Sequence, residues 1–179
     1  NLGNLYATLK QSDKAIENYQ AAIKIDNLFY PAKVNLAMLY NQQNQKDKAE
    51  QLLRDVVTTH PELYEIHYSL GLLLAEKKRY EESAKHLAVA SEGMPNRARI
   101  HYNLGKLLDF LRKDHEAEAA LIKALKLESN NLEFLYALAE FYLKKGKMQK
   151  AKEIAEQIVS KHPTQRVGHD LLNLIEKRR

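Results

Sequence analysis

Apolar and small residues recur along this chain with a spacing of 34 positions. The segment 67–71 reads His-Tyr-Ser-Leu-Gly and returns at 101–105 as His-Tyr-Asn-Leu-Gly, which is 34 residues later. A fixed period of about 20 to 50 residues is typical of repeat architectures. The sequence therefore predicts an array of similar units. One column of the repeat is always leucine, at Leu2, Leu36, Leu70, Leu104, Leu138 and Leu172.

Each period contains two clusters whose members lie three and four residues apart. In the first cluster of the third period, Leu70 is followed by Gly71 and then by Leu74. In the second cluster, the small residues Ser83 and Ala90 flank Leu87. Spacings of three and four place residues on one face of a helix. We therefore predict two amphipathic helices per period, which pack closely at their small positions.

Polar links between the clusters predict where these helices begin and end. Ser12, Asp47, Asp114 and Thr164 are expected as N-caps or first-turn residues. Pro61, Pro95 and Pro163 fit the starts of the helices that follow them. The predicted helix pairs cover residues 1–11 and 13–26, 31–43 and 46–59, 62–77 and 80–92, 97–111 and 114–128, and 132–145 and 148–161, with a last helix at about 165–177.

Leu-Gly followed by a bulky residue, then small, bulky and small residues and proline at these offsets, resembles the tetratricopeptide repeat. The resemblance covers essentially the whole chain and implies an all-α, right-handed α-solenoid of about five helix-turn-helix repeats with a C-terminal capping helix. We expect one array over residues 1–179. Its repeats would be at about 1–29 (lacking its start), 30–63, 64–97, 98–131 and 132–165, with the capping helix at 166–179.

The composition agrees with a globular helical array. Hydrophobic residues make up 45% and charged residues 28%, and no apolar run is long enough for membrane insertion. The chain has no cysteine, which excludes disulfides and thiolate metal sites. Its net charge of +5 comes from interspersed Lys, Arg, Asp and Glu, so nucleic-acid binding is not expected.

The resemblance implies that the first helix of each repeat lines a concave groove, and three tyrosines are the candidates for contacts there. Tyr68, Tyr102 and Tyr136 recur every 34 residues, two positions before the repeated leucine. Tyrosine offers a rigid apolar face and a hydroxyl, which suits an extended peptide. The alternative is that these rings cover the stems of neighbouring helices.

Polar groove positions supply three more candidates, Asn35, Asn103 and Lys106. Asparagine can donate to and accept from a peptide backbone, although it can equally join adjacent helices. Lys106 belongs to a set of mixed charges, for which solvated surface charge is the alternative role. That set consists of Glu65, Glu76, Arg99, Lys106, Asp109, Glu133, Glu140 and Lys144.

Some arrays of this family clamp the C-terminal carboxylates of a peptide with lysine, arginine and asparagine. Asn4 and Asn35 match the two asparagine positions of that clamp. Glu65 and Ser69 stand where lysine and arginine are required. We therefore expect no clamp of this kind.

Signals for metal binding and catalysis are weak. The seven histidines form no His-x-x-x-His pair, so packing or helix-end roles are favoured for His60, His67, His101 and His162. No phosphate loop or Gly-x-Ser-x-Gly motif occurs, and Glu81 and Glu82 are expected to be solvated. We expect no catalytic residue, metal or cofactor.

These observations predict a non-catalytic protein-interaction scaffold that binds a peptide segment or partner helix in its concave groove. One alternative is a structural spacer or self-assembly module, because an uncapped apolar edge is expected near Leu2, Tyr6 and Leu9. An RNA-binding helical repeat is a further alternative. The sequence does not indicate a cellular compartment.

Overall fold

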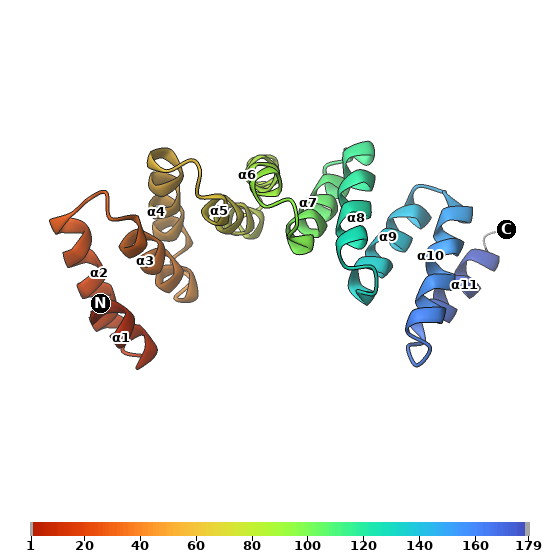
Figure 1. Ribbon diagram of the computed structural model, residues 1–179, viewed down its shortest axis with the longest axis horizontal. Helices are drawn as coiled ribbons and strands as arrows, with labels where there is room; N and C mark the ends of the chain where they lie inside the picture. Colours follow the sequence, from red (N-terminus) through yellow and green to blue (C-terminus); the bar gives the residue numbers. More distant parts are fainter. Residues whose placement is uncertain (1, 178–179) are drawn as a thin grey trace. The chain divides into compact units, whose positions relative to one another are not determined.

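The computed structural model describes residues 2–177, and over that range it consists of α-helices joined by short turns, without strands (Figure 1). The all-α fold and the helix pairs predicted from the sequence are confirmed, with each helix end within three residues of its expected position. The helices are α1 (Leu2–Thr8), α2 (Ser12–Ile25), α3 (Tyr30–Gln42), α4 (Lys46–Thr59), α5 (Tyr64–Glu76), α6 (Tyr80–Gly93), α7 (Ala98–Phe110), α8 (Asp114–Leu127), α9 (Leu132–Lys144), α10 (Met148–Lys161) and α11 (Val167–Glu176).

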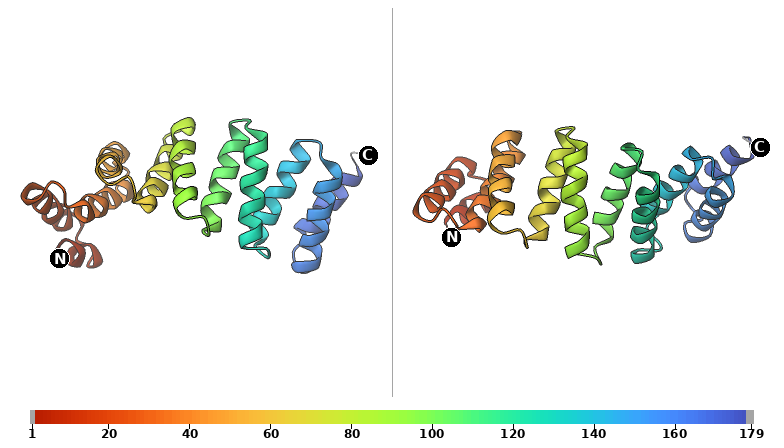
Figure 2. Two further views of the ribbon diagram at one scale, coloured as in Figure 1. Left: turned by 45° about the horizontal axis from the view of Figure 1, so that its top comes forward. Right: turned by 90° about the horizontal axis from the view of Figure 1, so that it is seen from above.

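The chain divides into two compact units between Gly93 and Met94. Unit 1 holds the helix pairs α1–α2, α3–α4 and α5–α6. Unit 2 holds α7–α8 and α9–α10, with α11 packed on α10. Figure 2 shows that the two helices of a pair run side by side, as expected for helix-turn-helix repeats.

The two helices of a pair approach closely at the small positions predicted from the sequence. Ser83 is fully buried, and its hydroxyl donates a 2.7 Å hydrogen bond to the backbone carbonyl of Gly71. A Cβ atom added to Gly71 would lie 2.9 Å from Cγ of Leu87, and one added to Gly105 would lie 2.8 Å from Cγ of Leu121. Glycine is therefore required for this packing as it stands, because any larger residue would displace the leucine of the second helix.

The turn after each first helix contains a residue in the left-handed conformation at the same place in every repeat. These residues are Lys10, Asn44, Lys78, Arg112 and Gly146, with φ between 57° and 70°. In the second repeat the amide of Gln45 then donates to the carbonyl of Tyr40 at 2.8 Å, which satisfies a carbonyl at the end of α3. The last of these turns uses glycine and the second uses asparagine, so the residues that usually adopt this conformation are missing from the other three.

Four expectations about helix starts were wrong. Pro61, Pro95 and Pro163 lie in the turns that precede α5, α7 and α11, because the chain needs these residues to reverse direction after the second helix. Thr164 also lies in such a turn, whereas Ser12, Asp47 and Asp114 are in first turns as expected.

Asn131 provides a helix cap that was not predicted from the sequence. Its Oδ1 atom accepts hydrogen bonds from the backbone amides of Glu133 and Phe134 at the start of α9. This satisfies two of the amide groups that a helix start leaves without partners.

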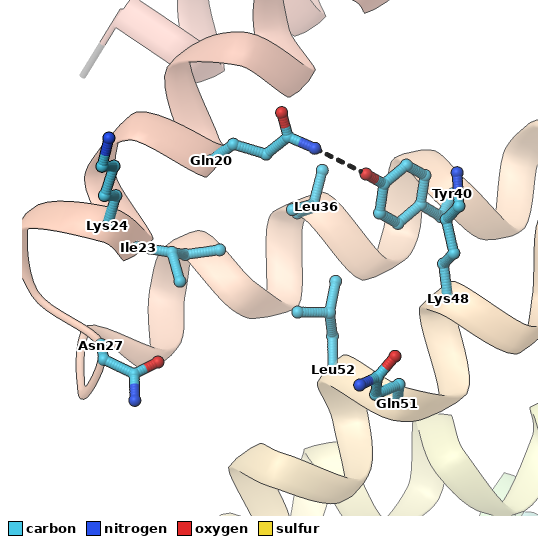
Figure 3. Close-up of a pocket in the computed structure, with 9 residues that line it drawn as sticks. All are labelled: Gln20, Ile23, Lys24, Asn27, Leu36, Tyr40, Lys48, Gln51 and Leu52. Carbon is cyan, nitrogen blue, oxygen red and sulfur yellow. Dashed lines mark hydrogen bonds between the residues drawn. The ribbon is translucent and has the colours of Figure 1, made fainter.

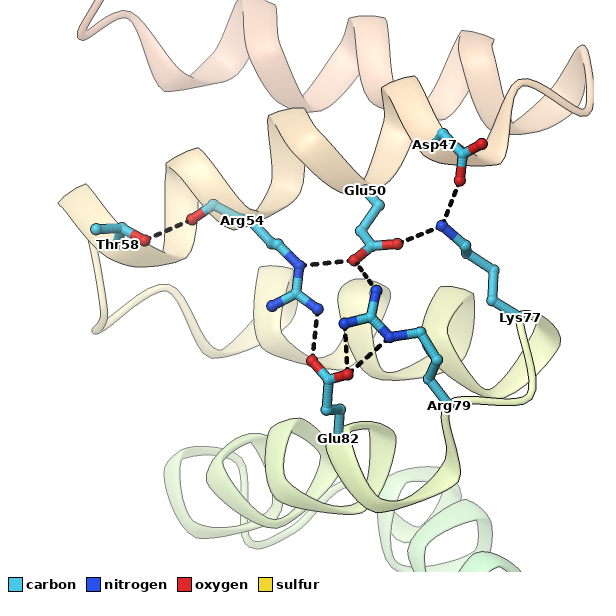
Figure 4. A network of polar contacts seen from close by, with 7 residues as sticks. All are labelled: Asp47, Glu50, Arg54, Thr58, Lys77, Arg79 and Glu82. Carbon is cyan, nitrogen blue, oxygen red and sulfur yellow. Dashed lines mark hydrogen bonds and ion pairs between the residues drawn. The ribbon is translucent and has the colours of Figure 1, made fainter.

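A buried carboxylate joins the second and third repeats of unit 1 (Figure 4). Glu50 on α4 is 6% exposed and accepts hydrogen bonds from Arg54 at 2.7 Å and from Lys77 and Arg79 at 2.5 Å. Burial alone would raise the pKa of Glu50, but the hydrogen bonds from Lys77 and Arg54 lower it to about 2. Lys77 and Arg79 flank the turn between α5 and α6, so these bonds tie α4 to the next repeat.

Glu82, which was expected to be solvated, belongs to the same network. Its carboxylate accepts hydrogen bonds from Arg54 at 2.6 Å and from Arg79 at 2.7 Å. The expectation was wrong because Arg54 reaches across from α4, a contact that the local sequence around Glu82 does not contain. Glu81 is exposed, as expected.

Unit 2 contains the same arrangement two periods later. Glu118 on α8 is at the repeat position of Glu50, and it accepts hydrogen bonds from Lys147, from Lys150 at 2.9 Å and from the hydroxyl of Tyr142 at 3.0 Å. The hydrogen bonds from Lys147 and Lys150 lower the pKa of Glu118 to about 2. The repeat between them carries Ala84 at this position, which has no carboxylate.

The two ends of the described chain differ in exposure. At α11, Gly168, Leu171 and Ile175 are buried, while Asp170, Asn173, Glu176 and Lys177 are exposed, so this helix covers α10 as predicted. At α1, Leu2, Leu5 and Leu9 are 60%, 53% and 55% exposed, whereas Tyr6 is half-buried and packs on the core of unit 1. The exposed apolar edge is confirmed at Leu2 and Leu9 but not at Tyr6, and self-association through it stays a prediction.

Replacing Glu50 with glutamine should destabilise unit 1 by about 1 to 3 kcal/mol, because an amide cannot satisfy three cationic donors around a buried site. Urea denaturation followed by circular dichroism measures the change. Glu81→Gln is the matched control and should stay within about 0.5 kcal/mol of the parent. Equal effects of the two substitutions would contradict a stabilising role for the Glu50 network.

The same carboxylates should make the fold sensitive to acid. The pKa of each is about 2 in the folded chain and about 4.3 in an unfolded one, so their stabilisation is present above pH 4.3 and is lost as the pH falls towards 2. Between pH 5 and pH 2.5, the parent should lose about 4 kcal/mol more than the Glu50→Gln, Glu118→Gln double variant, about 2 kcal/mol for each carboxylate. Denaturation curves at several pH values test this, and parallel losses would refute it.

Candidate peptide-binding surface

Exposed apolar side chains gather on the first helices of the repeats. Met38 on α3 is 57% exposed, Phe110 on α7 is 63% exposed and Tyr136 on α9 is 40% exposed. The second helices are α2, α4, α6, α8 and α10, and the only large hydrophobic side chain that they expose is Ile25 at the end of α2. We call the outward surface of α1, α3 and α5 the first-helix face of unit 1, and that of α7 and α9 the first-helix face of unit 2.

In unit 1, the asparagine candidate on this face joins neighbouring helices. Nδ2 of Asn35 on α3 donates a 3.0 Å hydrogen bond to Oδ1 of Asn4 on α1. The same oxygen accepts a 2.7 Å hydrogen bond from the buried Tyr19 hydroxyl of α2. Asn35 therefore connects adjacent repeats, which is one of the two roles that its residue type allows. Gripping a peptide backbone stays a prediction for it.

In unit 2, the Tyr102 side chain is held in place on almost every side. It is 6% exposed, and its ring stacks on that of Phe134 with centroids 4.8 Å apart. The Arg99 guanidinium lies 5.1 Å from the Tyr102 ring and 5.0 Å from the Phe134 ring, and the Lys106 ammonium lies 5.5 Å from the Tyr102 ring. Tyr102 thus connects α7 with α9.

The Tyr102 hydroxyl is also occupied. Burial raises the pKa of Tyr102 to about 12, and its hydrogen bond to the Glu133 carboxylate adds to this. The pKa of Glu133 is lowered, first by its 2.6 Å contact with Arg99 and further by the Tyr102 hydroxyl. The Tyr102 hydroxyl therefore has little hydrogen-bonding capacity left for a ligand.

The three recurring tyrosines are not equivalent. Tyr102 is buried, Tyr68 is half-buried and Tyr136 is exposed. The difference arises from the next repeat, since Phe134 covers Tyr102 and stands in a column that otherwise holds Ala32, Ile66, Ile100 and Gly168. Of the other candidates in unit 2, Asn103 is half-buried and Lys106 is exposed.

Several charges on this face neutralise each other across neighbouring helices. Besides the Arg99–Glu133 pair, Lys144 on α9 lies 3.6 Å from Asp109 on α7, and Lys145 lies 3.1 Å from the same carboxylate. The face of unit 2 therefore presents paired charges beside apolar side chains.

The histidines predicted to pack in the core do so. His67 and His101 are 8% and 9% exposed. Nδ1 of His67 lies 3.0 Å from Nδ1 of His86, and Nε2 of His101 lies 2.9 Å from the Pro95 carbonyl oxygen. Burial lowers the pKa of both His67 and His86. Within residues 2–177, no group of three or more His, Asp or Glu side chains is arranged to hold a metal ion.

One cavity was not predicted from the sequence. It has a volume of about 680 Å³ and lies among α2, α3 and α4 of unit 1 (Figure 3). Its lining comes from three helices and a turn, so no local motif indicates it. The lining residues are Gln20, Ile23, Lys24, Asn27, Leu36, Tyr40, Lys48, Gln51 and Leu52.

Comparison with protein families identifies the repeat. One model described as tetratricopeptide repeat matches residues 7–71 and 115–175, which together exceed half of the chain, and a second model with that description matches residues 98–131. The chain belongs to the tetratricopeptide-repeat family. It is thus an all-α helical-repeat protein of a family whose members are generally non-catalytic scaffolds for protein or peptide partners.

Solved structures of tetratricopeptide-repeat proteins have the same fold. The crystal structure of MamA matches with a TM-score of 0.84 at 20% identity, over 92% of this chain and 96% of that one. YrrB, described as having an unusual peptide-binding site, matches with a TM-score of 0.84 at 17% identity, over 97% and 89% of the two chains. PilF of Pseudomonas aeruginosa matches with a TM-score of 0.76 at 23% identity, over 99% and 82%.

These identities establish the fold alone. No curated protein matches the chain at the level of sequence. Among the described helices, none has the length and apolar character needed to cross a membrane.

Alanine substitutions at Tyr102 and Tyr136 should show that the first tyrosine stabilises unit 2 and the second is accessible. Tyr102→Ala should destabilise unit 2 by about 3 kcal/mol, because it removes a buried, stacked ring. Tyr136→Ala should cost less than about 1 kcal/mol, because that ring is 40% exposed. Thermal and urea denaturation measure both effects. If the two variants lose the same stability, Tyr102 does not hold α7 and α9 together.

Proposed function

We propose that this tetratricopeptide-repeat scaffold binds extended peptide segments of a partner protein on the first-helix face of each unit. The observation that supports this most is the distribution of exposed apolar side chains. Met38, Phe110 and Tyr136 are exposed there, while the second helices bury nearly all of theirs. Covering a large apolar side chain contributes about 1.5 to 3 kcal/mol, so a few such contacts can hold a peptide.

The other candidate residues take different roles in this proposal. Tyr68 and Tyr136 supply contact area, and Asn35, Asn103 and Lys106 supply polar contacts to the peptide. Tyr102 acts through Phe134 and Glu133, and it sets how α7 and α9 lie against each other. In this proposal, buried side chains shape the first-helix face and exposed ones contact the peptide.

The charge pattern indicates what kind of peptide would fit. The Arg99–Glu133 and Lys144–Asp109 pairs compensate each other within unit 2. A nearly neutral or mixed-charge peptide with apolar side chains suits such a surface. A polyanion such as RNA prefers walls of one positive sign, and the paired charges do not supply them.

A random peptide library displayed on phage provides the test. Selected peptides should bind the parent chain, and the variant Met38→Ser, Phe110→Ser, Tyr136→Ser should bind near-neutral peptides at least about tenfold more weakly, because it removes apolar contact area. Fluorescence anisotropy with labelled peptides measures the affinities.

The matched control replaces three exposed apolar side chains outside this face. Ile25→Ser, Leu28→Ser and Leu174→Ser together should leave these affinities within about twofold. If the control variant loses as much affinity as the first-helix variant, or if neither loses any, the peptide binds elsewhere. Light scattering of the same samples separates peptide binding from self-association through α1.

A further inference from the structure

The cavity among α2, α3 and α4 lies on the opposite side of α3 from the first-helix face. Leu36 and Tyr40 line it, whereas Met38 is exposed on the first-helix face. Residues two positions apart on an α-helix point in directions that differ by about 200°. A ligand in this cavity would therefore not compete for space with a peptide on the first-helix face.

The centre of the cavity is apolar and its rim is polar. Ile23, Leu36 and Leu52 come from three different helices and meet in the middle (Figure 3). The side-chain amide of Gln20 donates a 2.9 Å hydrogen bond to the Tyr40 hydroxyl at the rim. A volume of about 680 Å³ is within the range of about 300 to 1,000 Å³ that is common for ligand sites.

Both charged residues of the lining are lysines, and they lie on opposite sides of the apolar centre (Figure 3). The Lys48 ammonium donates a 2.7 Å hydrogen bond to Gln45 and lies 5.1 Å from the Tyr40 ring, so its partners are neutral. Among the described residues, neither Lys24 nor Lys48 forms an ion pair. No carboxylate lines the cavity.

Three carboxylates of α4 are engaged by cations that do not line the cavity. On α4, Asp47 binds Lys77, Glu50 binds Lys77 and both network arginines, and Asp55 binds Lys33. Beyond α2, the Asp26 side chain accepts the backbone amide of Leu28. The cavity lining therefore carries two lysines and no acidic residue around an apolar floor. In the chain as a whole the two signs are nearly balanced, with 23 acidic residues against 28 basic ones.

We propose that this cavity is a second binding site, which takes an acidic peptide segment of a partner protein. Aliphatic side chains of the segment would lie over Ile23, Leu36 and Leu52. Carboxylates on either side would pair with Lys24 and Lys48, and the segment's backbone would find hydrogen-bond partners in Gln20, Asn27 and Gln51. The inference uses the scaffold character of the family and does not depend on peptide binding at the first-helix face.

Two labelled hexapeptides test the proposal by fluorescence anisotropy. The acidic probe is Glu-Glu-Leu-Leu-Glu-Glu, and the neutral probe replaces each glutamate with glutamine. The parent chain should bind the acidic probe at least about tenfold more tightly than the neutral one, and added salt should weaken that binding. Equal affinity for the two probes, or no binding of the acidic one, would overturn the proposal.

Charge reversal locates the site. Lys24→Glu with Lys48→Glu should weaken binding of the acidic probe at least about tenfold, because two attractions become repulsions. The matched control is Lys78→Glu with Lys85→Glu, two exposed lysines of unit 1 that form no ion pair among the described residues. It changes net charge equally and should alter affinity less than about twofold. An equal loss of affinity in both variants would show only general charge attraction and would refute binding at this cavity.

Two further measurements keep this site distinct from the first-helix face and from self-association. The variant Met38→Ser, Phe110→Ser, Tyr136→Ser should bind the acidic probe like the parent, and a matching loss there would contradict a separate site. Light scattering compares the unlabelled parent chain with the Lys24→Glu, Lys48→Glu variant. The parent should form no oligomer that is lost in the variant. Such an oligomer would mean that the occupant is a second copy of the chain.

Discussion

The close contact between the two helices of each repeat is the constraint on which the rest of the structure depends. Where Ser83 meets the Gly71 carbonyl, no side chain separates the backbones, and Leu87 closes over the gap. A helix pair joined in this way still has apolar surface that it cannot bury alone, so neighbouring repeats must stack on it. The last pair has alanine at both of these positions, and Ala139 and Ala155 are fully buried.

Stacking of the repeats places polar side chains at their junctions. There, a carboxylate accepts hydrogen bonds from several cationic side chains. Glu50 and Glu118 occupy the same repeat position and bind basic residues at or beside the next turn. On the first-helix side, Asn4 and Asn35 join α1 to α3, and Tyr102, Arg99 and Glu133 join α7 to α9. These contacts orient the helices that would present a binding surface, so a buried residue such as Tyr102 shapes that surface without being exposed to a partner.

The helical array leaves two chemically different surfaces in unit 1. The first-helix face exposes Met38, while the cavity on the other side of α3 combines an apolar floor with Lys24 and Lys48. One scaffold can therefore offer separate surfaces to partners of different charge. This follows from the helical geometry of α3, which directs alternate residues to opposite sides.

The helices, their pairing and the family could be predicted from sequence, because the columns of leucine and small residues repeat every 34 positions and their spacing of three and four specifies helices. The accessibility of individual residues was decided only by tertiary structure. Tyr68, Tyr102 and Tyr136 share one column, yet they differ in exposure because each depends on side chains from the next repeat. The same holds for Glu82, which Arg54 reaches from another helix, and for the cavity, whose lining converges from three helices. A repeat period specifies where a residue lies on its own helix, whereas its neighbours come from residues about 20 to 34 positions away, and these differ from one repeat to the next.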